Sequence, residues 1–315
     1  MFKKYPSIEN HYRQKHIDMW LEKFPELKDA NFIAQEKIHG ANVQLIFDNG
    51  EFSHVGSRNG IIGPGAKFYN VWEAIEKLKT ETKLFPFISE CFPNQSVVLY
   101  GELFGGGVQK GVWYGKEQRI LFFDMAVDGK LLPCCDFERL LLFGGLSDVA
   151  VPTVASIMPL DQALNLDTNF NSILTPDEYD DPNICEGIVI KPWDLAFVDK
   201  HGSPFYIKKK NDEFKEKQKS LKPKVMKDVD PRISELQAEF ESYLNDARLQ
   251  NVFSKEGEID DHSKIGHYIK LVMADAREDF EKDFQSEILG LSKEDQRFIF
   301  SNGGKIIVKK LKEVL

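Results

Sequence analysis

The chain has 315 residues, a mass of 36.1 kDa, 42% hydrophobic residues and a net charge of −9 at pH 7. This length and apolar content suit a globular protein of two domains, and the acidic balance argues against a protein that coats nucleic acid with a uniformly basic surface. No segment of the sequence is long and apolar enough to span a bilayer, and the N-terminus lacks the apolar core of a signal peptide, so we expect a soluble, intracellular protein.

Strand signals dominate the first two thirds of the chain. The sequences FDNGEF at 47–52 and VDGKLL at 127–132 predict hairpin turns. Helical patterns in this part occur at 68–81 and 136–145. Segments rich in Val, Ile, Phe and Tyr predict strands at 31–37, 43–48, 51–58, 96–103, 118–127, 151–158, 186–192 and 204–210.

A lysine interrupts the apolar segment FIAQEKIHGANVQLIF at 32–47. Gly40 predicts a tight connection with an unusual backbone angle between two strands. Lys37 would then lie at the exit of a strand, in a short loop held on both sides by a sheet. The alternative is an ordinary hairpin with a solvated lysine at its edge, and these residues alone favour that alternative.

Other charged residues are attached to strands that are otherwise typical of a protein core. Burying such groups is unfavourable unless they are paired or bind a ligand. One such residue is explained by an ion pair, but several of them together with Lys37 indicate a pocket for a polyanion and its metal ions. The residues are Glu102 just past one strand, Glu186 and Lys191 at the two ends of another, and Lys208 and Lys210 on one face of a third.

Nucleotidyl transfer is the chemistry that uses such a set. A neutral lysine amine attacks the α-phosphate of a nucleoside triphosphate, and cations near the amine favour its neutral form. Carboxylates supply the oxygen ligands that Mg²⁺ prefers.

The pattern changes after a lysine-rich segment, residues 208–227, which has nine lysines and three acidic residues. This segment fits either a solvated linker between domains or a surface that follows phosphates. After Pro231, apolar residues recur at helical spacing, and SKED at 292–295 is similar to a capping box. The C-terminal part is therefore predicted to be helical.

Six short motifs occur in the order found in the covalent nucleotidyltransferases, which comprise ATP-dependent ligases and mRNA capping enzymes. The sequence resembles the RNA ligase 2 family more narrowly, because of His39, Asn42, the N-terminus MFKKYPSIENHY and the segment NVFSKEGEI at 251–259. The motifs are EKIHGAN (36–42), SRNG (57–60), YGELFG (100–105), FFDMA (122–126), EGIVIK (186–191) and IKKKN (207–211).

The resemblance implies an α+β fold. An adenylyltransferase catalytic domain of the nucleotidyltransferase (ATP-grasp-like DNA/RNA ligase adenylation) type, with antiparallel sheets, would occupy residues 1–225. A smaller all-helical domain that binds RNA would occupy residues 226–315. The implied cofactors are ATP and Mg²⁺ or Mn²⁺.

The resemblance also implies roles for single residues. Lys37 would accept AMP, Glu36 would help to place the adenine through its backbone, and Phe123 would stack on the adenine. Arg58 would contact the nucleotide or the RNA end, and Asn42 the ribose or the 3′-OH. Glu102 would contact the ribose and a metal ion, and Glu186 would bind metal. Lys208 and Lys210 would bind the α-phosphate, and Lys208 is the preferred residue for activating Lys37.

The expected activity is the ATP-dependent sealing of RNA breaks that have 3′-OH and 5′-phosphate ends, in nicked duplex or bridged RNA. We expect the protein to act as a monomer, in the cytoplasm of a cell or of a phage-infected host. Three alternatives stay open: a DNA ligase, an mRNA capping-type nucleotidyltransferase, and an inactive nucleic-acid-binding relative that uses the lysine-rich segment alone. The first two commonly carry an OB-fold after the catalytic domain, and the helical pattern here argues against both.

Overall fold

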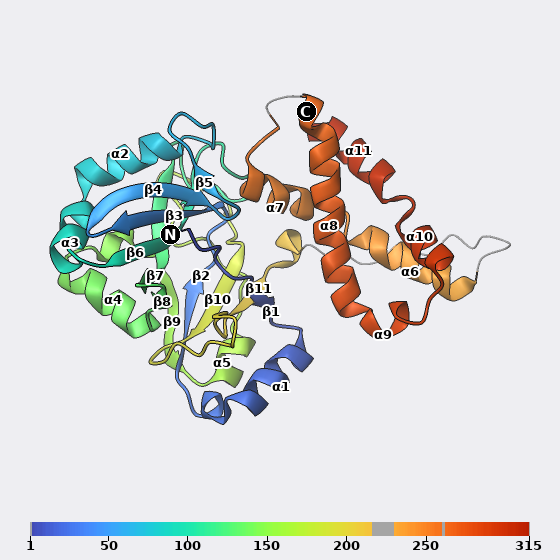
Figure 1. Ribbon diagram of the computed structural model, residues 1–315, viewed down its shortest axis with the longest axis horizontal. Coiled ribbons are helices and arrows are strands. Elements are labelled where there is room, and N and C mark those ends of the chain that lie inside the picture. Colours follow the sequence, from blue (N-terminus) through green and yellow to red (C-terminus); the bar gives the residue numbers. More distant parts are fainter. Residues whose placement is uncertain (1, 216–229, 260–261, 315) are drawn as a thin grey trace. The chain divides into compact units, whose positions relative to one another are not determined.

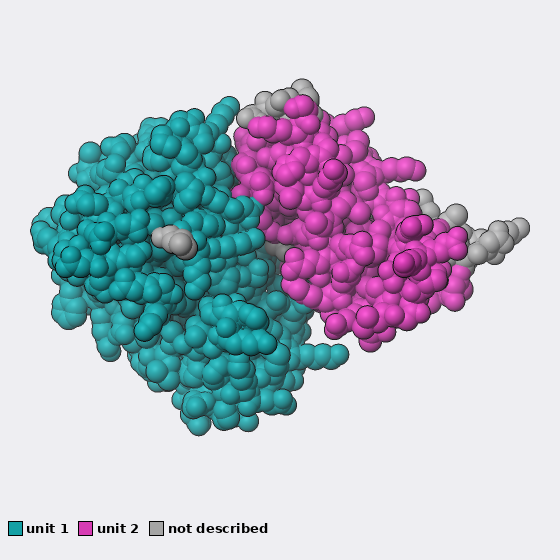
Figure 2. All heavy atoms as spheres, viewed as in Figure 1, with its two compact units in different colours: residues 1–212 teal, residues 213–315 magenta. Residues whose placement is uncertain are grey.

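The computed structural model describes residues 2–215, 230–259 and 262–314 (Figure 1). The chain divides into an N-terminal unit, residues 1–212, and a C-terminal unit, residues 213–315 (Figure 2). The expected domain boundary at residues 225/226 and the lysine-rich segment beyond residue 215 lie outside the described residues.

Two sheets form the frame of the N-terminal unit. The five-stranded sheet has the order β1-β11-β10-β2-β9, and its pairs are antiparallel apart from the parallel pair β1–β11. The six-stranded sheet has the order β5-β4-β3-β6-β7-β8 and is antiparallel throughout. The strands are β1 (Glu9–Asn10), β2 (Phe32–Glu36), β3 (Ala41–Asp48), β4 (Glu51–Ser57), β5 (Ile61–Ile62), β6 (Ser96–Phe104), β7 (Arg119–Val127), β8 (Lys130–Leu131), β9 (Thr153–Met158), β10 (Gly187–Pro192) and β11 (Ile207–Lys210).

Helices cover one face of each sheet (Figure 1). Because side chains alternate along a strand, Val43, Leu45 and Phe47 of β3 pack against the helices on the six-stranded sheet, and Asn42 and Gln44 point to its other face. The six-stranded sheet is covered by α2 (Val71–Glu81), α3 (Leu84–Cys91) and α4 (Cys134–Phe143). The five-stranded sheet is covered by α1 (Gln14–Lys23) and α5 (Leu160–Asn165). The 3₁₀ turns are η1 (Pro25–Lys28), η2 (Ser147–Val149) and η3 (Asp212–Phe214).

Both predicted hairpin turns are confirmed. Asn49 and Gly50 have φ of 54° and 77°, and Asp128 and Gly129 have φ of 49° and 76°. Two successive residues with positive φ match the right-handed twist of the flanking strands. The eight predicted strands and the two predicted helices are present. The helices α1, α3 and α5 and the two-residue strands were missed, because each is short and buries two residues or fewer, too few to establish a period.

The C-terminal unit is helical in all its described residues that have regular structure. The apolar residues that recur at helical spacing after Pro231 include Ile233, Leu236, Phe240 and Leu244, and all four are buried. Ser292 accepts a hydrogen bond from the Asp295 N–H at 3.0 Å, which confirms the predicted cap. The helices are α6 (Pro231–Ser242), α7 (Asp246–Glu256), α8 (Ile265–Asp283), α9 (Gln285–Ile288), α10 (Lys293–Phe300) and α11 (Gly303–Val314), with the 3₁₀ turn η4 (His262–Lys264).

A buried arginine ties two of these helices together. Arg248 of α7 is 1% exposed and donates to Asp279 of α8 at 2.9 Å and to Asp275. Its Nε donates to the Tyr243 carbonyl at 2.9 Å.

Within residues 2–215, 230–259 and 262–314, the structure has no helix with the length and apolar character needed to cross a membrane.

Candidate active site

The faces of the two sheets that carry no helices meet in the N-terminal unit. Apolar residues from both sides, among them Ile46 and Val98 of the six-stranded sheet and Tyr206 next to β11, pack there. The same faces carry the charged residues that the sequence singled out. The site is therefore formed between two sheets, by strands that are far apart along the chain.

Lys37 directly follows β2, and β3 begins only four residues later. β2 and β3 belong to different sheets, so the hairpin alternative is wrong. The Lys37 N–H donates to the Gly187 carbonyl at 2.9 Å, which fixes the start of this loop on β10. The loop thus carries the lysine from one sheet to the other.

Gly40 is required by close packing and not by its backbone angle. Its φ lies outside the left-handed region, so the expected unusual angle is wrong. A Cβ at this position would lie 2.3 Å from the Leu103 carbonyl oxygen and 2.9 Å from the Cγ of Glu102. The loop can approach β6 this closely only because the residue has no side chain.

Glu186 is the centre of the charged group. Its carboxylate accepts from the Lys37 Nζ at 2.8 Å and from the Lys210 Nζ at 2.9 Å, and His39 Nδ1 lies 3.2 Å away. Burial by itself raises the pKa of Glu186, but Lys210 and Lys37 outweigh burial and hold the pKa well below its usual range. Glu186 therefore stays ionised and holds both lysines in place.

Glu102 is the second carboxylate, and it lies within β6 instead of just past it as predicted. Burial raises the pKa of Glu102 to about 8; Lys37 acts in the opposite direction, and the neighbouring charge of Glu186 adds to the rise. A carboxyl group with this pKa carries a proton at neutral pH unless another cation replaces it.

Asn42 lies opposite Glu102 on the neighbouring strand β3. Its Nδ2 donates to the Gly101 carbonyl at 3.4 Å, but its buried Oδ1 has no hydrogen-bond partner among the residues that the structure describes. An unmatched amide oxygen beside two carboxylates is the donor set that a hard divalent cation prefers. The residues therefore fit Mg²⁺ or Mn²⁺. The described residues contain no cluster of three or more His, Cys, Asp or Glu that would hold a metal alone, so waters or substrate oxygens would complete the coordination.

Two family models together cover nearly all of the chain. Residues 30–228 match the family described as RNA ligase, and residues 226–310 match the family described as T4 RNA ligase 2 C-terminal. The chain belongs to the RNA ligase family. The predicted resemblance to the RNA ligase 2 family is thereby confirmed.

Solved structures of an RNA ligase are similar to this chain. This RNA ligase family chain is similar to a mutant of *Naegleria gruberi* RNA ligase with ATP and Mn, with 19% identity over 68% of this chain and 57% of that chain and a TM-score of 0.50. Another mutant of that enzyme, with AMP and Mn, has 17% identity over 67% of this chain and 56% of that chain and a TM-score of 0.48. This chain thus spans little more than half the length of these relatives. The predicted α+β fold, with antiparallel sheets followed by helices, is confirmed.

Of three further predicted residues, Arg58 and Lys208 lie near the Glu186 group, whereas Phe123 contacts Tyr5 and Lys191. Arg58 acts electrostatically on Glu102, and its Nη2 donates to the Ser7 hydroxyl at 3.0 Å. Lys208 precedes Lys210 by two residues on β11, so the two side chains leave the sheet on the same face. Phe123, on β7, is half-buried and packs edge-on against Tyr5.

Glu36 has its polar groups engaged within the fold. Its carboxylate accepts from the Ser172 hydroxyl at 2.5 Å and from the Ile173 N–H at 2.8 Å, and its own N–H donates to the Pro152 carbonyl at 2.9 Å. These bonds fix the end of β2 just before Lys37.

Lys191 does not join Glu186. Its Nζ donates to Asp124 at 3.0 Å and to the Phe123 carbonyl at 2.7 Å. This ion pair is buried, because both side chains are only 1% exposed. Glu186 directly precedes β10 and Lys191 lies near its other end, five residues or about 17 Å away along the extended chain, so the Lys191 side chain cannot reach Glu186.

Two residues near Lys37 received no role from the sequence. His39 Nε2 lies 2.9 Å from the Lys110 carbonyl, and the His39 N–H donates to the Tyr114 hydroxyl at 2.9 Å. Tyr114 is buried, and burial raises its pKa well above the usual value, so its hydroxyl stays neutral. His39 was visible in the motif EKIHGAN, whereas Tyr114 lies in a loop whose sequence gives no signal.

Proposed function

We propose that this protein is an ATP-dependent RNA ligase that seals 3′-OH/5′-phosphate breaks in duplex or bridged RNA, acting as a monomer. The observation that carries the proposal is the position of Lys37, 2.8 Å from Glu186 between two sheets, in a chain whose residues 30–228 match the RNA ligase family. The use of ATP and a divalent cation is supported by the *Naegleria gruberi* RNA ligase structure with ATP and Mn.

In the first step, the Lys37 Nζ attacks the α-phosphorus of ATP. A phosphorus–nitrogen bond forms, the bond to the bridging oxygen breaks, and pyrophosphate leaves with its electron pair. Only the neutral amine attacks, so its proton must first pass to water, which reaches the Lys37 side chain because that side chain is 21% exposed. Glu186 already accepts a hydrogen bond from this amine, and Lys210 lies on the other oxygen of the same carboxylate.

The phosphate charge is matched by residues of both sheets. Lys208 and Lys210 would hold the α-phosphate, and Arg58 the nucleotide or the RNA end. Glu102, Glu186 and the Asn42 Oδ1 would hold Mg²⁺ or Mn²⁺, which would neutralise charge on the triphosphate. Positioning and electrostatics of this kind carry most of the catalysis in phosphoryl transfer.

Glu102 and Asn42 would also contact the ribose, Phe123 would stack on the adenine, and Glu36 would help to place it. In the second step, AMP passes from Lys37 to the 5′-phosphate of the RNA, which forms a 5′-5′ pyrophosphate linkage. In the third, the adjacent 3′-OH attacks that phosphate and AMP leaves.

The two parts of the chain would divide this work. The adenylyltransferase part, assigned to residues 1–225, would carry out the covalent chemistry. The helical part, assigned to residues 226–315, would bind duplex RNA through shape, phosphates and 2′-hydroxyls. The match of residues 226–310 to the T4 RNA ligase 2 C-terminal family supports this division.

The test is covalent labelling. Purified protein is stripped of bound AMP with pyrophosphate, incubated with Mg²⁺ and ATP labelled on the α-phosphate, and separated by denaturing electrophoresis. We expect an acid-labile label that disappears in Lys37→Ala and persists in Lys67→Ala, an exposed lysine of the same unit. The absence of label in the wild-type protein, or equal labelling by GTP, would refute the proposal. Nicks with RNA or DNA at the 3′-OH side then identify the strand that is sealed.

A further inference from the structure

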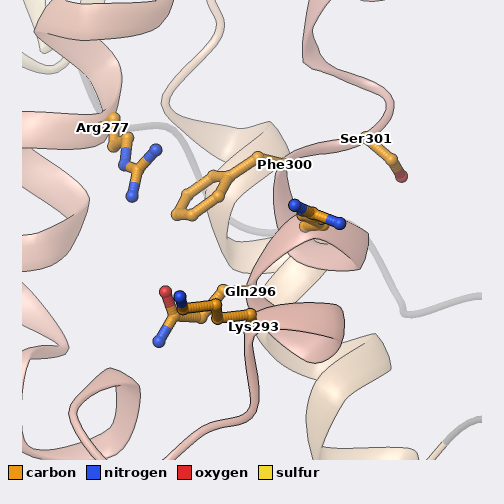
Figure 3. Close-up of a pocket in the computed structure, with 6 residues that line it drawn as sticks. Arg277, Lys293, Gln296, Phe300 and Ser301 are labelled. Carbon is orange, nitrogen blue, oxygen red and sulfur yellow. The ribbon is translucent and has the colours of Figure 1, made fainter.

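A basic pocket lies on the C-terminal unit (Figure 3). Its volume is about 420 Å³. Helix α8 contributes one cation and α10 contributes two, and no carboxylate lines it among the described residues. The lining residues are Arg277, Lys293, Gln296, Arg297, Phe300 and Ser301.

Arg277 is held in a defined orientation. Its guanidinium lies 4.5 Å from the ring centroid of Phe300, and its Nε donates to Glu281 one turn further along α8. The Phe300 ring is fixed in turn, because it packs edge-on against the buried Phe240 at 4.8 Å. Figure 3 shows the guanidinium facing this ring. The two Nη atoms form no hydrogen bond with any described residue, so they are available to an incoming acceptor.

Lys293 and Arg297 are exposed and have no ion pair or hydrogen bond within the described part of the chain. They are four residues apart on α10, so they lie on the same side of the helix and repel each other. A third cation from α8 adds to this repulsion. Arg277 is paired through its Nε with Glu281, but Lys293 and Arg297 have no ion pair among the described residues. Two unneutralised cations beside a third whose Nη atoms have no hydrogen bond, in a protein with a net charge of −9, are unfavourable for the fold but complementary to an anion.

We propose that this pocket binds a backbone phosphate of the RNA substrate, an inference that rests on the proposed function. The cations would neutralise the phosphodiester, with Arg277 presenting its two Nη donors edgewise. Gln296 uses its Nε2 to donate to the carbonyls of Ile288 and Leu291, both at 3.3 Å, so its oxygen is left to accept from a ribose 2′-hydroxyl.

The test compares two double variants of equal charge. Lys293→Ala with Arg297→Ala removes two cations from the pocket, and Lys270→Ala with Lys309→Ala removes two exposed lysines elsewhere in the same unit. Fluorescence anisotropy measures the binding of a labelled, nicked RNA duplex without ATP at several salt concentrations. Two duplexes of unrelated sequence are used, because phosphate contacts carry no sequence information.

We expect the pocket variant to bind both duplexes about tenfold more weakly, with the slope of log K against log salt reduced by about 1 to 2, and the control to change by about twofold or less. Equal losses in the two variants, or a loss for one duplex only, would overturn the proposal. Self-labelling with ATP is measured in parallel and stays unchanged. Absence of labelling in the wild-type protein would refute the ligase function. The binding comparison between the two double variants tests, independently of labelling, whether the pocket binds an RNA phosphate.

Discussion

Two ionic groups join the sheets of the N-terminal unit, and they differ in how completely the protein satisfies them. Asp124 accepts from Lys191 at 3.0 Å, from Tyr206 at 3.2 Å and from Tyr5, and none of the four side chains is more than 4% exposed. Glu186 also accepts from several donors, but Lys37 beside it is 21% exposed. The first group is closed to solvent and the second is open.

The open group also contains atoms that the protein leaves unmatched. The pKa of Glu102 is raised to about 8, chiefly by burial, and the Asn42 Oδ1 has no partner among the described residues. A fully satisfied buried group stabilises one structure, whereas an incompletely satisfied group is available to a ligand. We therefore assign stability to the Asp124 group and chemistry to the Glu186 group.

The largest expected effect on the free energy of unfolding comes from a substitution in the closed group. Lys191→Ala leaves the buried charge of Asp124 uncompensated, so we expect the free energy of unfolding to fall by about 3–5 kcal/mol. Urea denaturation followed by tryptophan fluorescence measures it, because all four tryptophans lie in the N-terminal unit.

Two variants control for this result. Lys191→Met combined with Asp124→Asn removes both charges and is expected to recover about half of the loss or more. Lys37→Ala is expected to cost about 1 kcal/mol or less, because Lys210 still pairs with Glu186 and the site is partly solvated. Equal losses for Lys191→Ala and Lys37→Ala would show that the two groups do not differ.

The pH dependence of stability tests the open group. The pKa of Glu102 rises from 4.5 to about 8 on folding, so between these values the unfolded state is ionised and the folded state holds a proton. Stability from this group therefore falls as pH rises from 4.5 to 8 and is constant above. Since the side chain is half-buried, we expect Glu102→Gln to be about 2 kcal/mol more stable than wild type at pH 8.5 and nearly equal at pH 4.5.

Urea denaturation of both proteins from pH 4.5 to 8.5 measures this difference. A divalent cation competes with the proton, so Mg²⁺ should stabilise the wild type more at pH 8.5 than at pH 6 and have little effect on Glu102→Gln. A stability difference that does not depend on pH would contradict the assigned pKa.

The smallest expected effect on stability is at Asn42. Because its Oδ1 has no partner among the described residues, Asn42→Ala should change the free energy of unfolding by about 1 kcal/mol or less. RNA sealing should nevertheless fall by about tenfold or more, since our proposal assigns this side chain to the metal ion and to the ribose or 3′-OH of the substrate. Sealing assays on nicked RNA, run together with urea denaturation, separate the effect on activity from the effect on stability. A variant that is destabilised and fully active would reverse our assignment.

The sequence by itself predicted Lys37, Glu186 and Lys210 as members of one charged group, and most of the elements that carry them. Its motifs placed Lys37 after a strand, Glu186 before another and Lys210 on a third, and the structure brings these three together. The helical period after Pro231 predicted the C-terminal unit. These features are local, because strand and helix periods and motif order are visible within a few residues.

Only the tertiary structure decided which charged residues meet. Lys37 and Glu186 are 149 residues apart, and the pairing of their strands depends on contacts that no local pattern records. The packing of the two sheets pairs Lys191 with Asp124 and places the Leu103 carbonyl oxygen 2.3 Å from where a Cβ at Gly40 would lie. It also brings the Tyr114 hydroxyl to the His39 N–H, in the loop that follows β2. Each of these outcomes depends on which face of a strand meets which neighbouring sheet, and that is fixed only when the two sheets pack together.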